Sequence, residues 1–494
     1  MHALRCRTFF ELLFILLIGV CTSVVLIKTL SMDAKWIKVI ILGLTGLTVL
    51  LIIPHREKVL LCLLTFLIPL KMDINFLRES VHYRRAIQGF VVSGFDIFFL
   101  ALMVLWIYRL SINHTLRINF FPHVTIPFFL MFALSLAGLS PAAVSFHVKV
   151  SVLWLMFKSW LVLIYVANNT DDQKLLYLVM GILLLTGLFQ SMVGVGQYAK
   201  GGPLGLGFLG ELGSLKSGQA GISRIGGTIG HANKMALFLG TLLQLNMACL
   251  FPSFPGSHKK LQWMYTVPFV PMLLTLLLTY SRGGWFSFLT GGVINCYWCA
   301  VRRTGKKVVS AIVVFGSFIL FAAMAFLLLE SVRNRLLMDD KGASEIRKPT
   351  AQIAKNIIYH NPWLGVGLNN YTSAIHKYDN TNFGASYHFP AAVHNVFLLI
   401  AAESGIPVLI LFLYTLGYLF YTLWRMSRTQ TDPLIPYLAI GFFCGLISWI
   451  MHNQKEYEYI FFQTRFWFNI GIILAMKSLT ERQEKEALQI GTNL

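Results

Sequence analysis

The stretch VVSAIVVFGSFILFAAMAFLLLE, residues 308–330, is apolar along almost its whole length and carries no charged side chain before Glu330. A helix of about 20 such residues is long enough to cross the hydrocarbon core of a bilayer. Runs of this kind recur along the whole chain. The sequence therefore predicts an all-α, polytopic integral membrane protein.

The composition agrees with this fold class. Of the 494 residues, 56% are hydrophobic and only 13% are charged, whereas a soluble domain carries roughly 25% charged residues. A formal net charge of +20 would direct attention to nucleic acid in a soluble protein, but in a membrane protein the positions of Lys and Arg matter more. We therefore expect the lipid bilayer as a partner and no nucleic acid.

The apolar runs define about 12–14 transmembrane helices. The first run follows Arg5 and Arg7, is longer than the apolar core of a signal peptide and lacks a small-residue cleavage site, so we expect an uncleaved helix. The run 58–70 is short enough to be re-entrant. The expected spans are 9–30, 36–53, 58–70, 94–110, 124–140, 149–168, 174–198, 231–251, 262–280, 284–300, 308–330, 394–424, 434–452 and 458–478.

Basic residues in the short loops predict the orientation. The basic clusters lie at 55–58, 258–260, 302–307 and 425–428. An even number of membrane crossings separates each cluster from the next, and both termini are basic as well. Placing the four clusters and both termini on the cytoplasmic side therefore satisfies the positive-inside rule. The loops that then face outward are 71–93, 199–230 and 331–393, the last being one large outer, or periplasmic, loop.

The large outer loop is expected to contain short helices. Residues 350–358 place four apolar side chains on one helical face, which is typical of a short amphipathic helix resting on the membrane surface. Asn361-Pro362 would end this helix, and the Gly-Val-Gly sequence at 365–367 would form a turn.

Three spans enter from the outer side directly after polar stretches, at His231, Ser281 and His394. Helix N-termini carry unpaired N–H groups and partial positive charge, which favour an anion. The arginines placed to assist are Arg224 before the first span, Arg282 at the second and Arg347 in the loop before the third. Arginine binds phosphate groups bidentately and stays charged, so the set suits a pyrophosphate.

Each of these residues also has a purely structural interpretation. Arg282 could extend to the membrane interface, and Arg224 and Arg347 could be solvated charges. Ser281 could be only a helix cap, and His394 could be only a hydrogen-bonding residue at a helix end.

Glu403 follows His394 by nine residues, which at 100° per residue places it on the opposite side of a helix and about 13 Å deeper. It cannot orient the His394 ring from there. We expect a structural ion pair between Glu403 and Arg465 or Lys158, which both lie in apolar spans.

Four stretches of the second half combine glycines with polar residues next to apolar runs: RIGGTIGHANKMA (224–236), TYSRGGWFSFL (279–289), NPWLGVGLNNY (361–371) and HNVFLLIAAESG (394–405). Together they resemble the O-antigen ligase and polymerase superfamily, and the resemblance covers about residues 200–473. His394-Asn395 followed by Gly405 matches the H-N-x9-G signature of the ligases, with Val408 where the signature usually has Gly, Thr or Tyr.

The resemblance implies a polysaccharide-assembling membrane glycosyltransferase of the cell envelope. Such enzymes move a glycan from a polyprenyl, typically undecaprenyl, pyrophosphate carrier to a hydroxyl acceptor on the outer face of the bacterial inner membrane. The implied parts are N-terminal transmembrane helices (1–198), a ligase-like region (199–478) that includes the outer loop, and a cytoplasmic tail (479–494).

The resemblance also implies roles for individual residues. His394 would be the general base, and Arg224, Arg282 and Arg347 would bind the pyrophosphate. Ser281, Gly283, Asn395 and Glu403 would support this site. The family is metal-independent and inverting, so neither a metal nor another cofactor is expected.

The chemistry agrees with these roles. Polyprenyl pyrophosphate is an activated leaving group, so the enzyme needs a base, positive charge and positioning. No acidic D-x-D pair or His/Cys ligand cluster in the sequence calls for a metal, and Asp339-Asp340 is expected to be solvated.

Two points stay open at the level of sequence. The acceptor could be lipid A-core, as in lipopolysaccharide assembly, another carrier-linked glycan, or a protein hydroxyl. The alternative function is a transporter or flippase for a small anion or a lipid-linked glycan, suggested by Lys158, Glu403 and Arg465 within spans. The lack of internal repeats and the large outer loop favour the transferase, and a scaffold role in envelope assembly is a third hypothesis.

Overall fold

The structure, a computed structural model, describes residues 54–76, 87–139, 146–213, 224–252, 262–328, 330–337, 346–382 and 384–491. The described chain is helical except for loops and one two-stranded sheet, formed by β1 (Asp73–Phe76) and β2 (Phe90–Ser93). Six of the described helices are long and apolar enough to cross a membrane. The predicted all-α, polytopic membrane fold is confirmed.

The six long apolar helices are α4 (Gly94–Ile112), α6 (Phe146–Asn169), α7 (Gln173–Lys200), α12 (Lys307–Leu328), α18 (Ile406–Met426) and α19 (Ile435–Asn453). A shorter apolar helix is α5 (Pro122–Ala137), and the expected span 262–280 is interrupted at Val267-Pro268 into α9 (Gln262–Thr266) and α10 (Phe269–Leu278). The expected spans 9–30 and 36–53 lie outside the described residues, so the total of 12–14 stays a prediction.

The chain divides into two compact units. In the described part of the first unit, α3 (Arg56–Leu67) packs on α4, and Arg109 Nη1 lies 3.1 Å from Glu57 Oε2. The second unit contains residues 68–92 and everything from Phe120 onward, and it holds all the residues of the candidate site.

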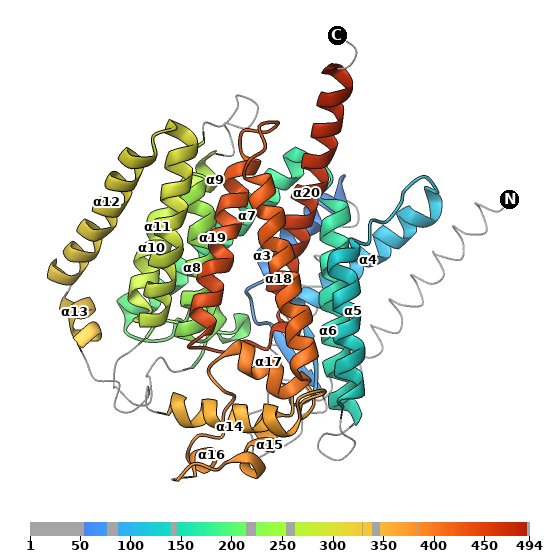
Figure 1. The fold of residues 1–494 in the computed structure, drawn as a ribbon. Helices are drawn as coiled ribbons and strands as arrows, with labels where there is room; N and C mark the ends of the chain where they lie inside the picture. Colours follow the sequence, from blue (N-terminus) through green and yellow to red (C-terminus); the bar gives the residue numbers. More distant parts are fainter. Residues whose placement is uncertain are drawn as a thin grey trace. The chain divides into compact units, whose positions relative to one another are not determined.

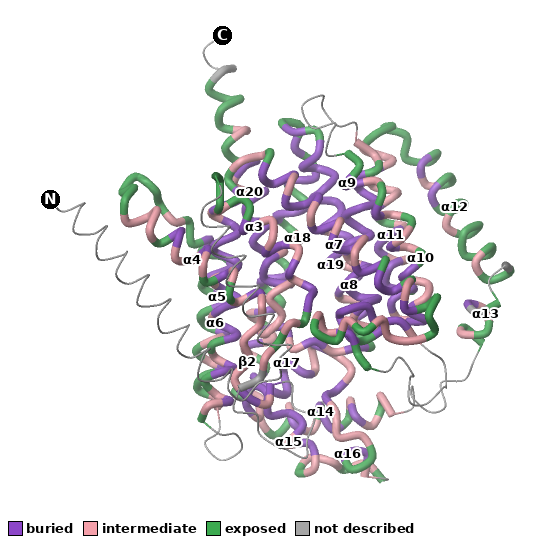
Figure 2. Tube along the Cα trace, turned by 180° about the vertical axis from the view of Figure 1, so that it is seen from behind, coloured by how far each residue is buried: buried purple, intermediate pink, exposed green. Residues whose placement is uncertain are grey.

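Close packing of α8 (Ala232–Ala248), α11 (Arg282–Thr304) and α19 forms the centre of the second unit, which Figure 2 shows as largely buried. Glycines permit this approach: a Cβ atom on Gly291 would lie 2.2 Å from Ser448 Oγ. Small residues and interhelical hydrogen bonds are the usual means of helix association in lipid. Here Gln244 Nε2 donates to Phe288 O at 2.9 Å and to Ser448 Oγ at 3.1 Å.

A layer of short helices lies at one end of this unit (Figure 1). It comprises α14 (Arg347–His360), α15 (Tyr371–Ala374), η4 (Ile375–Tyr378) and α16 (Ala385–His388), and it follows α13 (Glu330–Leu337) in the chain. We call it the outer layer, because it comes from the loop 331–393 that is expected to face outward. The amphipathic helix expected over 350–358 is present in α14. Its apolar face does not rest on a membrane surface, because Ile353, Ala354 and Ile357 are buried against α17 (Val396–Ser404).

The expectation of one continuous span over 394–424 is wrong. Gly405, with φ of +88° and ψ of 167°, ends α17 and begins α18, a backbone conformation that is essentially restricted to glycine. The segment 361–367 crosses this corner and is hydrogen-bonded to it: Ile406 N–H donates to Pro362 O at 2.8 Å, and Gly367 N–H donates to Glu403 O at 2.8 Å. The glycine of the H-N-x9-G signature therefore forms the corner between α17 and α18.

We predict that Gly405→Ala destabilises the protein strongly. The new Cβ would lie 2.1 Å from Trp363 O, and the backbone strain alone costs about 1–3 kcal/mol. The measurement is thermal unfolding of the detergent-purified protein. Gly417→Ala in the middle of α18 is the matched control, because nothing lies within 4 Å of its added Cβ and alanine favours a helix by roughly 0.5–1 kcal/mol. Equal melting temperatures for Gly405→Ala and the wild type would contradict this account of the corner.

Candidate active site

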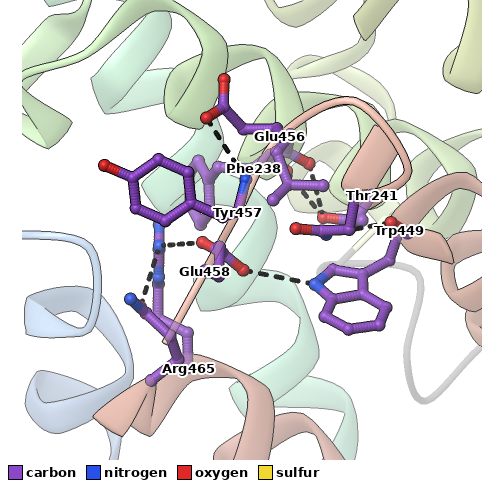
Figure 3. Close-up of polar contacts among 10 residues, drawn as sticks. Phe238, Thr241, Trp449, Glu456, Tyr457, Glu458 and Arg465 are labelled. Atoms are coloured by element: carbon purple, nitrogen blue, oxygen red, sulfur yellow. Dashed lines mark hydrogen bonds and ion pairs between the residues drawn. The ribbon is translucent and has the colours of Figure 1, made fainter. Parts of the chain in front are cut away.

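The segment between α19 and α20 (Thr464–Gly491) contains two buried carboxylates. Glu456 and Glu458 lie on either side of Tyr457, and Figure 3 shows their side chains pointing in different directions. Neither carboxylate stood out in the sequence. One feature of the sequence could have indicated them: two acids lie in a short link between two apolar spans, in a chain with only 21 acidic residues.

Glu456 faces the predicted base. Its Oε1 atom lies 3.5 Å from Nδ1 of His394, and the His394 ring meets the Tyr457 ring edge-on at 5.3 Å between centroids. The His394 side chain is 36% exposed and that of Glu456 only 5%. With Nδ1 directed at the carboxylate, Nε2 is the nitrogen left to face a substrate, and it has no hydrogen-bond partner among the described residues.

The other oxygen of Glu456 connects the site to a predicted arginine. Asn233 Nδ2 donates to Glu456 Oε2 at 2.5 Å, and Arg224 Nη2 donates to Asn233 Oδ1 at 2.6 Å. Arg224 is fixed further by a hydrogen bond from its Nε to Thr279 O at 2.9 Å. A continuous polar chain therefore runs from Arg224 through Asn233 and Glu456 to His394.

These contacts decide the charge of Glu456. Burial favours its neutral form, but the His394 imidazole at 3.5 Å, the nearby His231 side chain and the Asn233 hydrogen bond outweigh this effect and lower the pKa of Glu456 to about 2. Glu456 is therefore ionised at neutral pH.

Asn395 positions His394. Its Oδ1 atom accepts hydrogen bonds from the N–H groups of Phe397 at 3.0 Å and Leu398 at 3.1 Å, which caps α17. Its Nδ2 atom donates to Gln454 Oε1 at 3.0 Å. The His-Asn pair is thus attached both to its own helix and to the segment that carries Glu456.

The first turn of α11 lies beside the same cluster. Ser281 caps the helix, its Oγ accepting from Gly284 N–H at 3.3 Å. The buried His452 side chain contacts the backbone of both Gly283 and Asn233. His452 therefore joins the positive N-terminal end of α11 to Asn233 in the polar chain. Arg282 occupies the first position of this helix and is half-buried.

Arg347 differs from the other two arginines. It opens α14 in the outer layer and is half-buried. Among the described residues, no contact joins Arg347 to the chain from Arg224 to His394. The helix that it opens nevertheless packs on α17, the helix that His394 precedes.

A second group of charges surrounds Glu458. Arg465 Nη2 lies 3.1 Å from Glu458 Oε1, and Trp449 Nε1 donates to Glu458 Oε2 at 3.3 Å (Figure 3). Lys71 is exposed, yet loss of part of its hydration and repulsion from Lys234 and Arg465 lower its pKa to about 8. Arg465 and Lys71 therefore lie near Glu458, and Lys234 lies near Lys71. Of these three cations, the sequence had indicated only Arg465, as a partner for Glu403.

A narrow, mostly apolar cleft begins at this second group and continues between α7, α8, α19 and α20. Glu458, Gln463, Arg465 and Asn469 provide its polar atoms. Apolar side chains that line it include Leu183, Leu242, Leu446, Phe466 and Ile473. Its composition suits a chain-like apolar group with a charged end.

Glu403 does not form the expected ion pair. Arg465 contacts Glu458 instead, and the buried Glu403 accepts a hydrogen bond from Tyr371 N–H at 3.1 Å. Burial raises the pKa of Glu403 to about 8, against the lowering effect of the backbone N–H groups of residues 369–371. Glu403 therefore fastens the outer layer to the α17–α18 corner and does not contact His394.

Taken together, the described residues place an exposed imidazole nitrogen, a buried ionised carboxylate and several cations at one end of a membrane protein. Such a set can remove a proton from a neutral nucleophile and stabilise a departing anion.

Residues 267–413 match the family described as O-antigen ligase. The match includes Arg282, Arg347, His394 and Gly405 but neither Arg224 nor the segment with Glu456. No curated protein matches the chain. The resemblance drawn from the motifs is confirmed over this narrower range, and it supports a multi-pass membrane glycosyltransferase of the O-antigen ligase or polymerase type.

We predict a pH-dependent stability that originates at Glu403. Because its pKa is raised from 4.5 to about 8 in the fold, the folded protein holds this proton more tightly than the unfolded chain. The contribution is therefore complete below pH 4.5 and is lost as the pH rises to about 8. Melting temperatures across this range should fall less in Glu403→Gln than in the wild type.

Glu403→Ala is the second variant in this series. It leaves the backbone N–H donors of residues 369–371 without their acceptor, so it should lower the unfolding free energy by about 1–3 kcal/mol at pH 6, whereas Glu403→Gln keeps an acceptor. If Gln and Ala melt alike at pH 6, the hydrogen bond to Tyr371 is not what stabilises this turn.

Proposed function

We propose that the protein is a lipid-linked glycan transferase that moves a glycan from a polyprenyl pyrophosphate carrier to a hydroxyl acceptor at the outer face of the bacterial inner membrane. The observation that carries this proposal is the buried, ionised Glu456 placed 3.5 Å from Nδ1 of His394. The O-antigen ligase match over 267–413 supports the reaction class.

In the proposed reaction, Nε2 of His394 takes the proton of the acceptor hydroxyl as its oxygen attacks the anomeric carbon of the glycan. The bond from that carbon to the pyrophosphate oxygen breaks, and polyprenyl pyrophosphate leaves with the bonding electrons. Attack from the face opposite the leaving group inverts the anomeric centre. Glu456 acts through His394 as a positioning residue, since it stabilises the imidazolium that forms.

The pyrophosphate would bind among the positive groups beside this base. Arg224 contacts Asn233, and Arg282 opens the helix α11. Arg465 contacts Glu458, and Lys71 lies near Glu458, Arg465 and Lys234. Positive groups fixed in advance around a developing phosphate charge lower the barrier to its departure. Arg347 stays a proposed contact from the outer layer, and Ser281, Gly283 and Asn395 are proposed to hold the helix ends in place.

The apolar cleft below Arg465 is where we propose that the first isoprene units of the carrier lie. Their apolar surface would replace water along α7, α8, α19 and α20 while the pyrophosphate stays at the charged end. The cleft and the cations thereby orient the donor relative to His394.

Glycan transfer by the purified protein in detergent, with EDTA present, tests the function directly. We expect turnover of a polyprenyl pyrophosphate glycan and loss of about 10²–10⁴ in kcat for His394→Ala, the usual contribution of a general base. His388→Ala, an exposed histidine at the end of α16, is the control and should keep full activity.

The acceptor arms of the same assay separate the subclasses. Product without an added acceptor, as a carrier-linked ladder, identifies a polymerase; dependence on lipid A-core identifies a ligase; and transfer to an added protein identifies a protein glycosyltransferase. Undiminished transfer by His394→Ala would exclude the mechanism, and donor uptake into vesicles without transfer would favour a transporter. Loss of turnover in EDTA that zinc or magnesium restores would exclude metal independence.

The proposed roles of the two carboxylates predict different kinetic defects. Glu456→Gln removes the charge beside His394, so kcat should fall about 10- to 100-fold with little change in the donor KM. Glu458→Gln, the same change two residues along, loosens Arg465 and should instead raise the donor KM. Steady-state kinetics of both variants decide this, and identical defects in both would contradict the assignment of separate roles.

A further inference from the structure

A second cavity, of about 410 Å³, lies between α18 and α20 at the end of the second unit opposite the outer layer (Figure 1). From α18 and the turn after it come Tyr418, Tyr421, Trp424, Arg425 and Arg428, and from α20 come Lys477, Thr480, Glu481 and Glu484. None of these residues belongs to the candidate active site.

The position of the cavity along the helices identifies its environment. The long apolar helix α18 ends at Met426, and two aromatic rings in its last turns, Tyr421 and Trp424, are exposed. Exposed Tyr and Trp rings next to basic residues mark the level of the lipid headgroups. The cavity therefore opens where a phospholipid headgroup would lie, on the side that the positive-inside rule makes cytoplasmic.

The two walls of the cavity carry charges of opposite sign. The α18 wall has Arg425 and Arg428, and the Arg428 guanidinium lies 3.8 Å from the centroid of the Trp424 ring. Stacking of this kind occupies the face of a guanidinium and leaves its N–H edge to bind an anion. No carboxylate contacts either arginine among the described residues.

The α20 wall is negative on balance. The one lysine of this wall, Lys477, is paired with Glu481 at 2.8 Å. Glu484 has no ion-pair partner within the part of the chain that the structure describes. Glu484 is half-buried, and its Oε1 atom accepts from the Thr429 hydroxyl at 3.2 Å. A headgroup that is only anionic would satisfy the arginines but would face Glu484 unfavourably.

We propose that this cavity binds the headgroup of a zwitterionic phospholipid that has a primary ammonium, such as phosphatidylethanolamine. The phosphate would contact Arg425 and Arg428, the ammonium would contact Glu484 and the hydroxyl of Thr480, and the acyl chains would extend along Tyr421 and Trp424. The site is independent of the proposed glycan transfer.

Lipid retention by the full-length protein tests this proposal. Native mass spectrometry would compare phosphatidylethanolamine, phosphatidylglycerol and phosphatidylcholine of identical acyl chains, each added to delipidated protein. We expect phosphatidylethanolamine to be retained best. Arg425→Gln with Arg428→Gln should lower its retention about tenfold, as expected for loss of a charge-assisted hydrogen bond. Glu484→Gln should abolish the preference over phosphatidylglycerol.

Arg482→Gln is the matched control, because Arg482 lies on the same helix but does not line the cavity. It should leave retention unchanged. Equal or tighter retention of phosphatidylglycerol by the wild type, or undiminished phosphatidylethanolamine in the double arginine variant, would overturn the proposal. Soluble phosphoethanolamine and inorganic phosphate form two further arms, and binding of either as tight as that of the lipid would assign the cavity to a soluble ligand instead.

Discussion

A carboxylate enclosed by protein stays ionised only where hydrogen bonds and positive charges replace the water that it has lost. At Glu456 this replacement comes from His394, Asn233 and the nearby His231. His231 precedes Glu456 by 225 residues in the sequence, and His394 precedes it by 62 residues. The segments around the candidate site are therefore arranged so that their polar side chains meet at Glu456 and stabilise its buried charge.

Much of the fold follows from local patterns. The apolar runs predict the long helices, and the four apolar residues of 350–358 predict α14, because both depend on the spacing of side chains along one helix. His394, Arg224 and the α11 terminus could also be selected, since helix starts and polar stretches are visible in the sequence. Which of these residues contact one another could not be predicted. Asn233 and Glu456, which join Arg224 to His394, belong to segments that are distant in the chain.

The errors have physical causes as well. Glu403 was expected to need a cation, but a buried carboxyl can instead take up a proton and accept backbone hydrogen bonds, as it does at the 369–371 turn. The span 394–424 was expected to be continuous because its residues are apolar throughout. The span is interrupted by the conformation of Gly405 and by the segment 361–367 that crosses it. Neither feature changes the hydropathy of residues 394–424, so hydropathy could not reveal the interruption.

The Asn233 amide lies between a guanidinium and a carboxylate and contacts both. A direct pair of Arg224 and Glu456 would cancel both charges at close range. The neutral Asn233 amide separates the two charges. It hydrogen-bonds to both groups and fixes their positions, while the charge of each group can still act on a different neighbour. In the proposed reaction, the field of Arg224 would act on the departing phosphate and the field of Glu456 on the protonated imidazole. The two halves of the reaction could thus be supported separately within a single chain of polar contacts.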